Sequence, residues 1–182
     1  DTGGDRNTRL HGCVKAHAAA RAEPTPNDTF PHSDPSMTAS MTDKPWFHNG
    51  LRFECTNCGN CCRVHGDYAF VYLSEKDIDN ISGYLGLDRK EFLDRHCKVL
   101  DGWVTLKFDQ PACAFLTKDN RCGIYPARPK QCATWPFFQE NLVKEVWEGP
   151  VKECCPGVGK GELRPAEEVL RIARENEEWY AS

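Results

Sequence analysis

The sequence lacks the long apolar run that a membrane-spanning helix needs. Hydrophobic residues make up 40% and charged residues 27% of the 182 residues, and no stretch approaches the roughly 20 consecutive apolar residues that cross a bilayer. The apolar core of a signal peptide is missing too, since the longest apolar run between His11 and Ala22 is Ala18–Ala20. We therefore expect no membrane partner and a cytoplasmic location, where disulfides are uncommon.

An excess of positive charge is also absent. The chain has 23 Lys and Arg against 27 Asp and Glu, for a net charge of −4, whereas nucleic-acid-binding surfaces are basic and clustered. No Ser-His-Asp set, phosphate-binding loop or dinucleotide glycine motif is visible, nor is the C-x3-C-x2-C spacing of radical-methionine enzymes. These absences argue against a nucleic-acid partner. They also leave catalysis by this domain alone unsupported and its catalytic residues unassigned.

Cysteine, in contrast, is abundant. The chain holds 11 cysteines, four of them within the run Cys55-Thr-Asn-Cys58-Gly-Asn-Cys61-Cys62. The C-x-x-C spacing lets two thiolates from one tight loop reach the same metal ion. The side chains of adjacent Cys61 and Cys62 diverge from an extended backbone. This pair therefore suits two metal ions, two irons of one cluster or two nearby clusters.

Four further cysteines stand in contexts that favour a ligand role: Cys113, Cys122, Cys132 and Cys155. Each is expected in a turn or at an element end, where backbone N–H groups can donate to a metal-bound thiolate. Cys155 precedes Pro156, a pairing that closes many iron–sulfur motifs. Cys97 is instead expected to be a small buried hydrophobe. Cys154 could replace Cys155 or be a nearby free thiol, and Cys13 receives no role.

Together these residues resemble a known family. The pattern runs from Cys-x-x-Cys-x-x-Cys-Cys through Cys113-Ala-Phe-Leu, Arg121-Cys-Gly-Ile-Tyr-Pro-Ala-Arg-Pro-Lys-Gln-Cys132 and Trp135-Pro-Phe to Cys155-Pro-Gly. It is similar to the YkgJ-type cysteine-cluster family of zinc- or iron-chelating domains, often labelled iron–sulfur oxidoreductases, and to the metal-binding region of flagellin lysine-N-methylases. The resemblance implies that the metal ligands are Cys55, Cys58, Cys61, Cys62, Cys113, Cys122, Cys132 and Cys155.

The thiolate set leaves zinc and iron both open, because tetrahedral all-thiolate sites suit either metal. Eight thiolates could hold two zinc ions or two cubane clusters, and zinc closed by four thiolates would be structural. We favour iron–sulfur clusters, with more than one metal ion, in an electron-transfer or accessory protein with an unknown protein partner. The alternatives are an oxidoreductase or protein-methylating enzyme, and a zinc-stabilised interaction module without catalysis.

Other polar side chains near the cysteines carry weaker expectations. His48 and His65 are close enough in sequence to be alternative ligands but are more typical of surface histidines. Lys130 is expected in a solvated turn, whereas Arg128 belongs to the family pattern. The solvated face of a capped helix is expected to contain Glu75, Asp77 and Asp79.

The hydrophobic pattern predicts a small, single α+β domain stapled by metal–thiolate bonds. Strands are expected over 51–54 and 68–73, in a hairpin over 98–108 that turns at Asp101-Gly102, and around 118–121. Helices are expected over 74–84, 88–95, 126–132 and 165–180, the last being a C-terminal helix.

The chain is expected to divide into a tail and one domain. Residues 1–44 are rich in proline and polar side chains, which predicts a disordered extension. Met41 reads like a natural start, so residues 1–40 could also be a processed leader or translated upstream sequence. Residues 45–182 are expected to form the cysteine-cluster domain.

Overall fold

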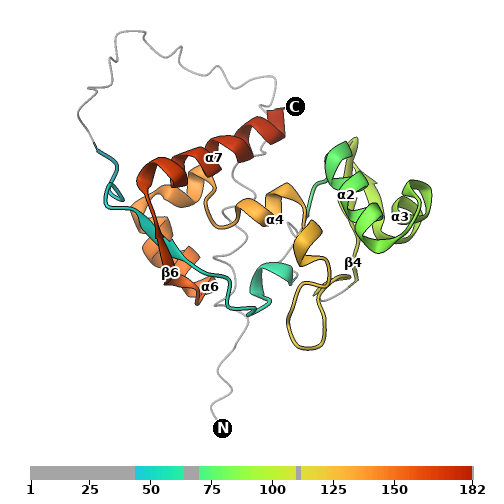
Figure 1. Ribbon diagram of the computed structural model, residues 1–182, viewed down its shortest axis with the longest axis horizontal. Coiled ribbons are helices and arrows are strands. Elements are labelled where there is room, and N and C mark those ends of the chain that lie inside the picture. Colours follow the sequence, from blue (N-terminus) through green and yellow to red (C-terminus); the bar gives the residue numbers. More distant parts are fainter. Residues whose placement is uncertain (1–43, 64–69, 110–111, 182) are drawn as a thin grey trace, which may run out of the picture.

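The computed structural model describes residues 44–63, 70–109 and 112–181 (Figure 1). The predicted disordered extension and His65 lie outside these residues. The described part is α+β, as the sequence predicts, with helices and three two-stranded antiparallel sheets. Among these residues, no helix is both long and apolar enough to cross a membrane.

One group of elements combines two helices with a hairpin. It contains α2 (Glu75–Leu85), α3 (Arg89–His96), β2 (Cys97–Leu100) and β3 (Trp103–Leu106). The predicted cap is confirmed, because Ser74 forms a capping box with Asp77 at the start of α2. The predicted turn is confirmed as well, since Asp101 and Gly102 have φ angles of 50° and 83°.

In the described part of the predicted strand over 68–73, the structure has a single bridge between Tyr72 and Thr105 rather than a full strand. The Leu73 N–H donates to Val104 O and the Leu106 N–H donates to Val71 O, both at 2.9 Å. This segment therefore lies along β3 and extends the hairpin. Beneath it, Ile78, Ile81 and Phe92 form the centre of a fully buried core.

A second group surrounds a sheet of β1 (Leu51–Phe53) and β6 (Val158–Arg164). It also contains the C-terminal helix α7 (Ala166–Ala181), which confirms the prediction for that segment, and three short helical segments: η5 (Gln139–Leu142), α5 (Lys144–Val146) and α6 (Lys152–Cys154). A π-helical turn, η6 (Trp147–Val151), joins α5 to α6. Their core includes Phe137, Trp147 and Val169.

Short elements lie between these groups, and three of them contain cysteines: η2 (Asn60–Cys62), β5 (Ala112–Cys113) and α4 (Lys130–Thr134). The other two are β4 (Phe108–Asp109) and η4 (Tyr125–Ala127). The strand pair expected around 118–121 is a single bridge between Leu116 and Cys122. The helical segment expected over 126–132 is two short helices, because Pro129 disfavours the α conformation of Arg128 and leaves it extended.

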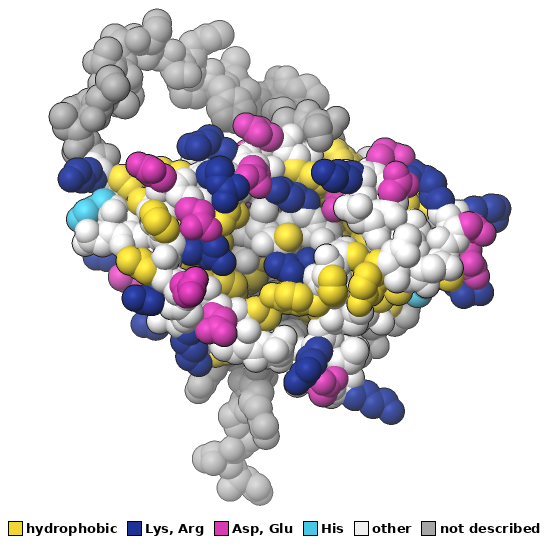
Figure 2. All heavy atoms as spheres, viewed as in Figure 1, with side chains coloured by type: hydrophobic (Ala, Val, Ile, Leu, Met, Phe, Trp, Pro, Cys, Tyr) yellow, Lys and Arg dark blue, Asp and Glu magenta, His cyan; other side chains and the backbone are white. Residues whose placement is uncertain are grey.

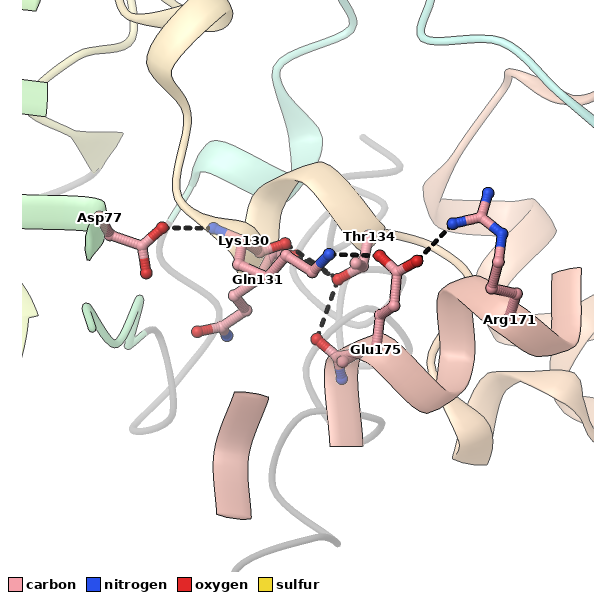
Figure 3. Close-up of polar contacts among 7 residues, drawn as sticks. Asp77, Lys130, Gln131, Thr134, Arg171 and Glu175 are labelled. Atoms are coloured by element: carbon pink, nitrogen blue, oxygen red, sulfur yellow. Dashed lines mark hydrogen bonds and ion pairs between the residues drawn. The ribbon is translucent and has the colours of Figure 1, made fainter. Parts of the chain in front are cut away.

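Helix α4 lies between the two groups and is held by polar contacts with both (Figures 1 and 3). Asp77 Oδ1 accepts from the Lys130 N–H at 2.9 Å, and the Lys130 ammonium group pairs with Glu175 of α7. On the next turn, Thr134 Oγ1 donates to Asn176 Oδ1 at 2.9 Å. These contacts fix the position of α4 relative to α2 and α7.

Asp77 is the centre of this arrangement. The residue is 6% exposed, and its carboxylate also accepts from Trp179 Nε1 at 3.1 Å and from the Ser74 N–H at 3.0 Å. The prediction of a solvated side chain is therefore wrong for Asp77, although Glu75 and Asp79 are exposed. Lys130 is half-buried rather than part of a solvated turn, because its ammonium group is paired with Glu175.

Replacing Asp77 should destabilise the fold far more than replacing Asp79 on the same helix. Asp77→Ala leaves buried donors on three elements without their acceptor, and we expect a loss of about 2–4 kcal/mol in the free energy of unfolding. Asp79→Ala removes only an exposed ion pair with Arg89, which is worth at most about 1 kcal/mol. Urea unfolding followed by circular dichroism measures both, and equal losses would contradict the role given to Asp77.

Candidate metal centre

All eight predicted ligands line a single cavity of about 840 Å³. They come from several short elements and loops: Cys55, Cys58, Cys61, Cys62, Cys113, Cys122, Cys132 and Cys155. Aromatic side chains share the wall, among them Phe53, Phe115 and Trp135. Figure 2 shows basic and hydrophobic side chains side by side over the middle of the molecule.

The first four cysteines follow β1. Cys55 and Cys58 lie in the loop after the strand, and Cys61 and Cys62 lie in η2. Gly59 separates the two pairs with a φ of 71°, and a Cβ there would approach Asn120 and Leu116 to 3.2 Å. The loop therefore needs glycine at this position both for its backbone conformation and for its close packing.

Backbone N–H groups act on the thiols of Cys113 and Cys122. Cys113 lies in β5, and the Phe115 N–H lowers the pKa of its thiol against the larger effect of burial. Cys122 follows the turn over 117–121, and the Ile124 N–H likewise lowers the pKa of its thiol. Both cysteines therefore lie at an element end or after a turn, as the sequence predicts, where such groups can stabilise a metal-bound thiolate.

Cys132 and Cys155 come from two short helices. Cys132 is in α4, and Cys155 directly follows α6. The indole Nε1–H of Trp135 donates to Cys155 Sγ at 3.0 Å. Sequence reasoning did not assign this donor role to Trp135, although the Trp-Pro-Phe segment belongs to the pattern that carries the family resemblance.

Burial and crowding keep these thiols protonated in the metal-free protein. Burial raises the pKa of Cys113 to about 12 and that of Cys155 to about 11. Burial, with the charges of neighbouring cysteines, raises the pKa of Cys132 well above its ordinary value. The pKa of Cys62 is raised as well. The hydrogen bond with Cys61 is the largest cause, and burial is the second. An incoming metal ion must therefore displace protons.

The thiols are gathered but not yet arranged around an ion. Within the described residues, no group of three or more Cys, His, Asp or Glu side chains is positioned to hold a metal. Cys55 and Cys61 are exposed, and the sulfurs of Cys61 and Cys62 are 3.9 Å apart. The donor set nevertheless fits zinc or iron, because thiolates are ligands that both favour.

Cys97 and His48, which the sequence does not favour as ligands, lie away from the cavity. Cys97 is 7% exposed and packs in the core around Ile78, which confirms its prediction as a small buried hydrophobe. His48 is exposed, with Nδ1 at 3.3 Å from Pro45 O. In contrast, Arg128 lines the cavity and stacks on Tyr125, 4.0 Å from the ring centroid.

The comparison with known families agrees with this cysteine arrangement. Residues 54–156 match the family CxxCxxCC, described as "Putative zinc- or iron-chelating domain". The chain belongs to the CxxCxxCC family. The matched range begins just before Cys55 and ends just after Cys155, so it contains all eight cysteines of the cavity.

Relatives of this CxxCxxCC protein include two chains from Methanocaldococcus jannaschii, both named as uncharacterized proteins. MJ0661 is 28% identical over 133 residues, which cover 69% of this chain and 68% of the relative. MJ0939 is 26% identical over 137 residues, covering 69% of this chain but 45% of the relative. The match thus spans less than half of the second relative. No solved structure matches the chain.

The raised thiol pKa values predict that the metal-free protein loses stability at alkaline pH. A group whose pKa is higher in the folded chain stabilises the fold below its unfolded pKa, and this contribution is lost as the pH rises through the folded pKa. For Cys155 this window runs from 9.0 to about 11, and for Cys113 from 9.0 to about 12.

We therefore expect the free energy of unfolding of the reduced, metal-free protein to be level from pH 7 to 8 and to fall from pH 9 to 11. The metal-loaded protein should lack this fall, because its thiols have already lost their protons. Urea unfolding at each pH measures both samples. A metal-free protein that is equally stable at pH 8 and pH 11 would contradict the prediction.

Proposed function

We propose that this domain binds iron–sulfur clusters through its eight cavity cysteines, with more than one metal-binding site. The observation that carries the proposal is the convergence of thiols from distant segments, Cys55 after β1 and Cys155 after α6, on one cavity. Membership of a family described by zinc or iron chelation supports it. A shared core could bury cysteines singly, but it would not direct eight of them into one space.

The cavity favours clusters over bare zinc ions. Its volume of about 840 Å³ leaves room for inorganic sulfide between the thiols, whereas a zinc site closed by four thiolates needs little more than the ion itself. Phe53, Phe115 and Trp135 on its wall would shield part of a cluster from water. The hydrogen bond from Trp135 Nε1 to Cys155 Sγ is of the kind that tunes the reduction potential of a cluster.

The role that follows is electron transfer, or support of a partner enzyme, rather than catalysis by this domain. A bound cluster would supply one-electron transfer. The protein contributes thiol ligands, hydrogen bonds to sulfur and an apolar wall. Basic side chains such as Arg128, whose charge opposes the raised pKa of Cys122 and Cys132, would offset the negative charge of a loaded centre.

Anaerobic purification tests the identity of the metal. We expect a brown protein with visible absorption, containing iron and inorganic sulfide in similar amounts and little zinc. Elemental analysis and sulfide determination measure these quantities, and Cys97→Ala, outside the cavity, should give the same values. A colourless protein with about two zinc ions for eight thiolates would replace the electron-transfer role with that of a zinc-stabilised interaction module.

Metal removal should weaken the fold, because a bound metal would cross-link thiols from segments that pack against different cores. Forming a metal–thiolate site and folding are coupled processes. We expect chelation under reducing conditions to lower the midpoint of thermal unfolding, and readdition of the metal to restore it. An unchanged cooperative melt after complete metal removal would show that the site does not stabilise the domain.

A further inference from the structure

Three of the cysteines are joined on one side of the cavity by backbone pairing. Arg63 forms an antiparallel bridge with Ala112, which places the preceding Cys62 opposite Cys113. The Leu116–Cys122 bridge, with the Gly123 N–H donating to Phe115 O at 2.8 Å, folds Cys122 back towards the segment that begins at Cys113. Cys62, Cys113 and Cys122 therefore lie close together.

Cys132 belongs to the same side. It packs, with Cys113 and Cys122, against the core that contains Leu106 and Ile124. These three cysteines and Cys62 are all half-buried.

The opposite side of the cavity is built on Cys155, which packs with Trp135 and Phe138 in a separate core. The Glu54 N–H donates to Gly157 O at 3.2 Å, and Asn60 Nδ2 donates to Cys154 O at 2.7 Å. These two contacts hold both ends of the loop that carries Cys55 and Cys58 against the segment around Cys155.

We propose that the eight thiols form two metal-binding tetrads of unequal accessibility. The inner tetrad is Cys62, Cys113, Cys122 and Cys132, and the outer tetrad is Cys55, Cys58, Cys61 and Cys155. The adjacent Cys61 and Cys62, whose sulfurs are 3.9 Å apart, are assigned to different tetrads because Cys61 is exposed, whereas Cys62 is half-buried and precedes Arg63, which bridges Ala112. The proposal rests on the proposed metal binding and assigns its ligands.

Exposure makes the outer tetrad the site of metal exchange. Two of its four thiols, Cys55 and Cys61, are exposed, and none of the inner tetrad is. A chelator in solution can therefore displace the outer thiolates one after another, each taking up a proton as its metal–sulfur bond breaks. No oxidation or reduction is involved. The inner tetrad has no exposed thiol at which this displacement could begin.

Zinc release from the wild-type chain tests the proposal without any substitution. The metal-free, reduced protein is loaded with zinc, and release to the chelator 4-(2-pyridylazo)resorcinol is followed by absorbance. We expect two zinc equivalents, one for each four thiolates, with one leaving about tenfold faster than the other or more. Alkylation after the fast phase, followed by peptide mapping, should label Cys55, Cys58 and Cys61 but spare Cys113, Cys122 and Cys132.

Paired variants then test the ligand assignment. The double change Cys55→Ser with Cys58→Ser should remove the fast equivalent alone, and Cys113→Ser with Cys132→Ser should remove the slow equivalent alone. Cys97→Ala, a buried cysteine outside the cavity, is the control and should keep both.

The outcomes separate this inference from the proposed function. A wild-type chain that binds no zinc and carries no metal as purified would overturn metal binding itself. A chain that binds zinc but releases it in one phase, or whose eight thiols become alkylated together, would keep metal binding and overturn the two tetrads. Loss of all zinc in both paired variants would likewise indicate one interdependent centre.

Discussion

The hydrogen bond between the Glu54 N–H and Gly157 O closes the longest loop among the proposed ligands. It sets the C-x-x-C loop, which begins at Cys55, beside Cys155. This contact requires glycine, since a Cβ on Gly157 would lie 1.9 Å from Glu54 O. Closing so long a loop costs conformational entropy that depends only weakly on length. The β1–β6 pairing next to this contact offsets part of that cost and places both ends of the chain segment at the cavity.

The wall opposite this closure depends on polar contacts rather than on a large apolar core. Gln131 accepts from the Tyr72 N–H at 3.0 Å and donates to Phe70 O at 3.2 Å, while Lys130 and Thr134 on the same helix contact α7. Each satisfied contact contributes only about 0.5–1.5 kcal/mol, but each also has a defined direction. Such contacts hold α4, and with it Cys132, at the edge of a space that apolar packing would otherwise fill.

Features encoded over a few residues could be predicted from the sequence, and those that depend on distant partners could not. Ser74 and the Asp101-Gly102 pair act on their immediate neighbours, so the capped helix and the hairpin were predictable. The sequence does not predict strand β6, because Gly159 and Gly161 interrupt its pattern. Gly161 is explained by its φ of 77° and by its close approach to Glu54, which lies far away in the sequence. From its sequence neighbours, Asp77 is predicted to be a surface acid. The structure buries it because its carboxylate accepts from Lys130 and Trp179, which are distant in the sequence. Cysteine spacing and the family resemblance indicated the candidate ligands, whereas the grouping of their segments around a cavity is a property of the tertiary fold.

The charge of a loaded centre gives a reason for the basic residues on its wall. Eight thiolates around two divalent ions leave a net charge of about −4, which an apolar cavity would disfavour. Three of the lining cations, Lys130, Arg164 and Arg171, are paired with glutamates. Arg63 and Arg128 instead contact neutral groups, Asn120 Oδ1 at 2.6 Å and Tyr125 O at 3.0 Å. Their positive charges therefore remain available to offset thiolates. Because Arg63 follows Cys62 and the charge of Arg128 acts on Cys122, this compensation is strongest on the more enclosed side, where water can contribute least.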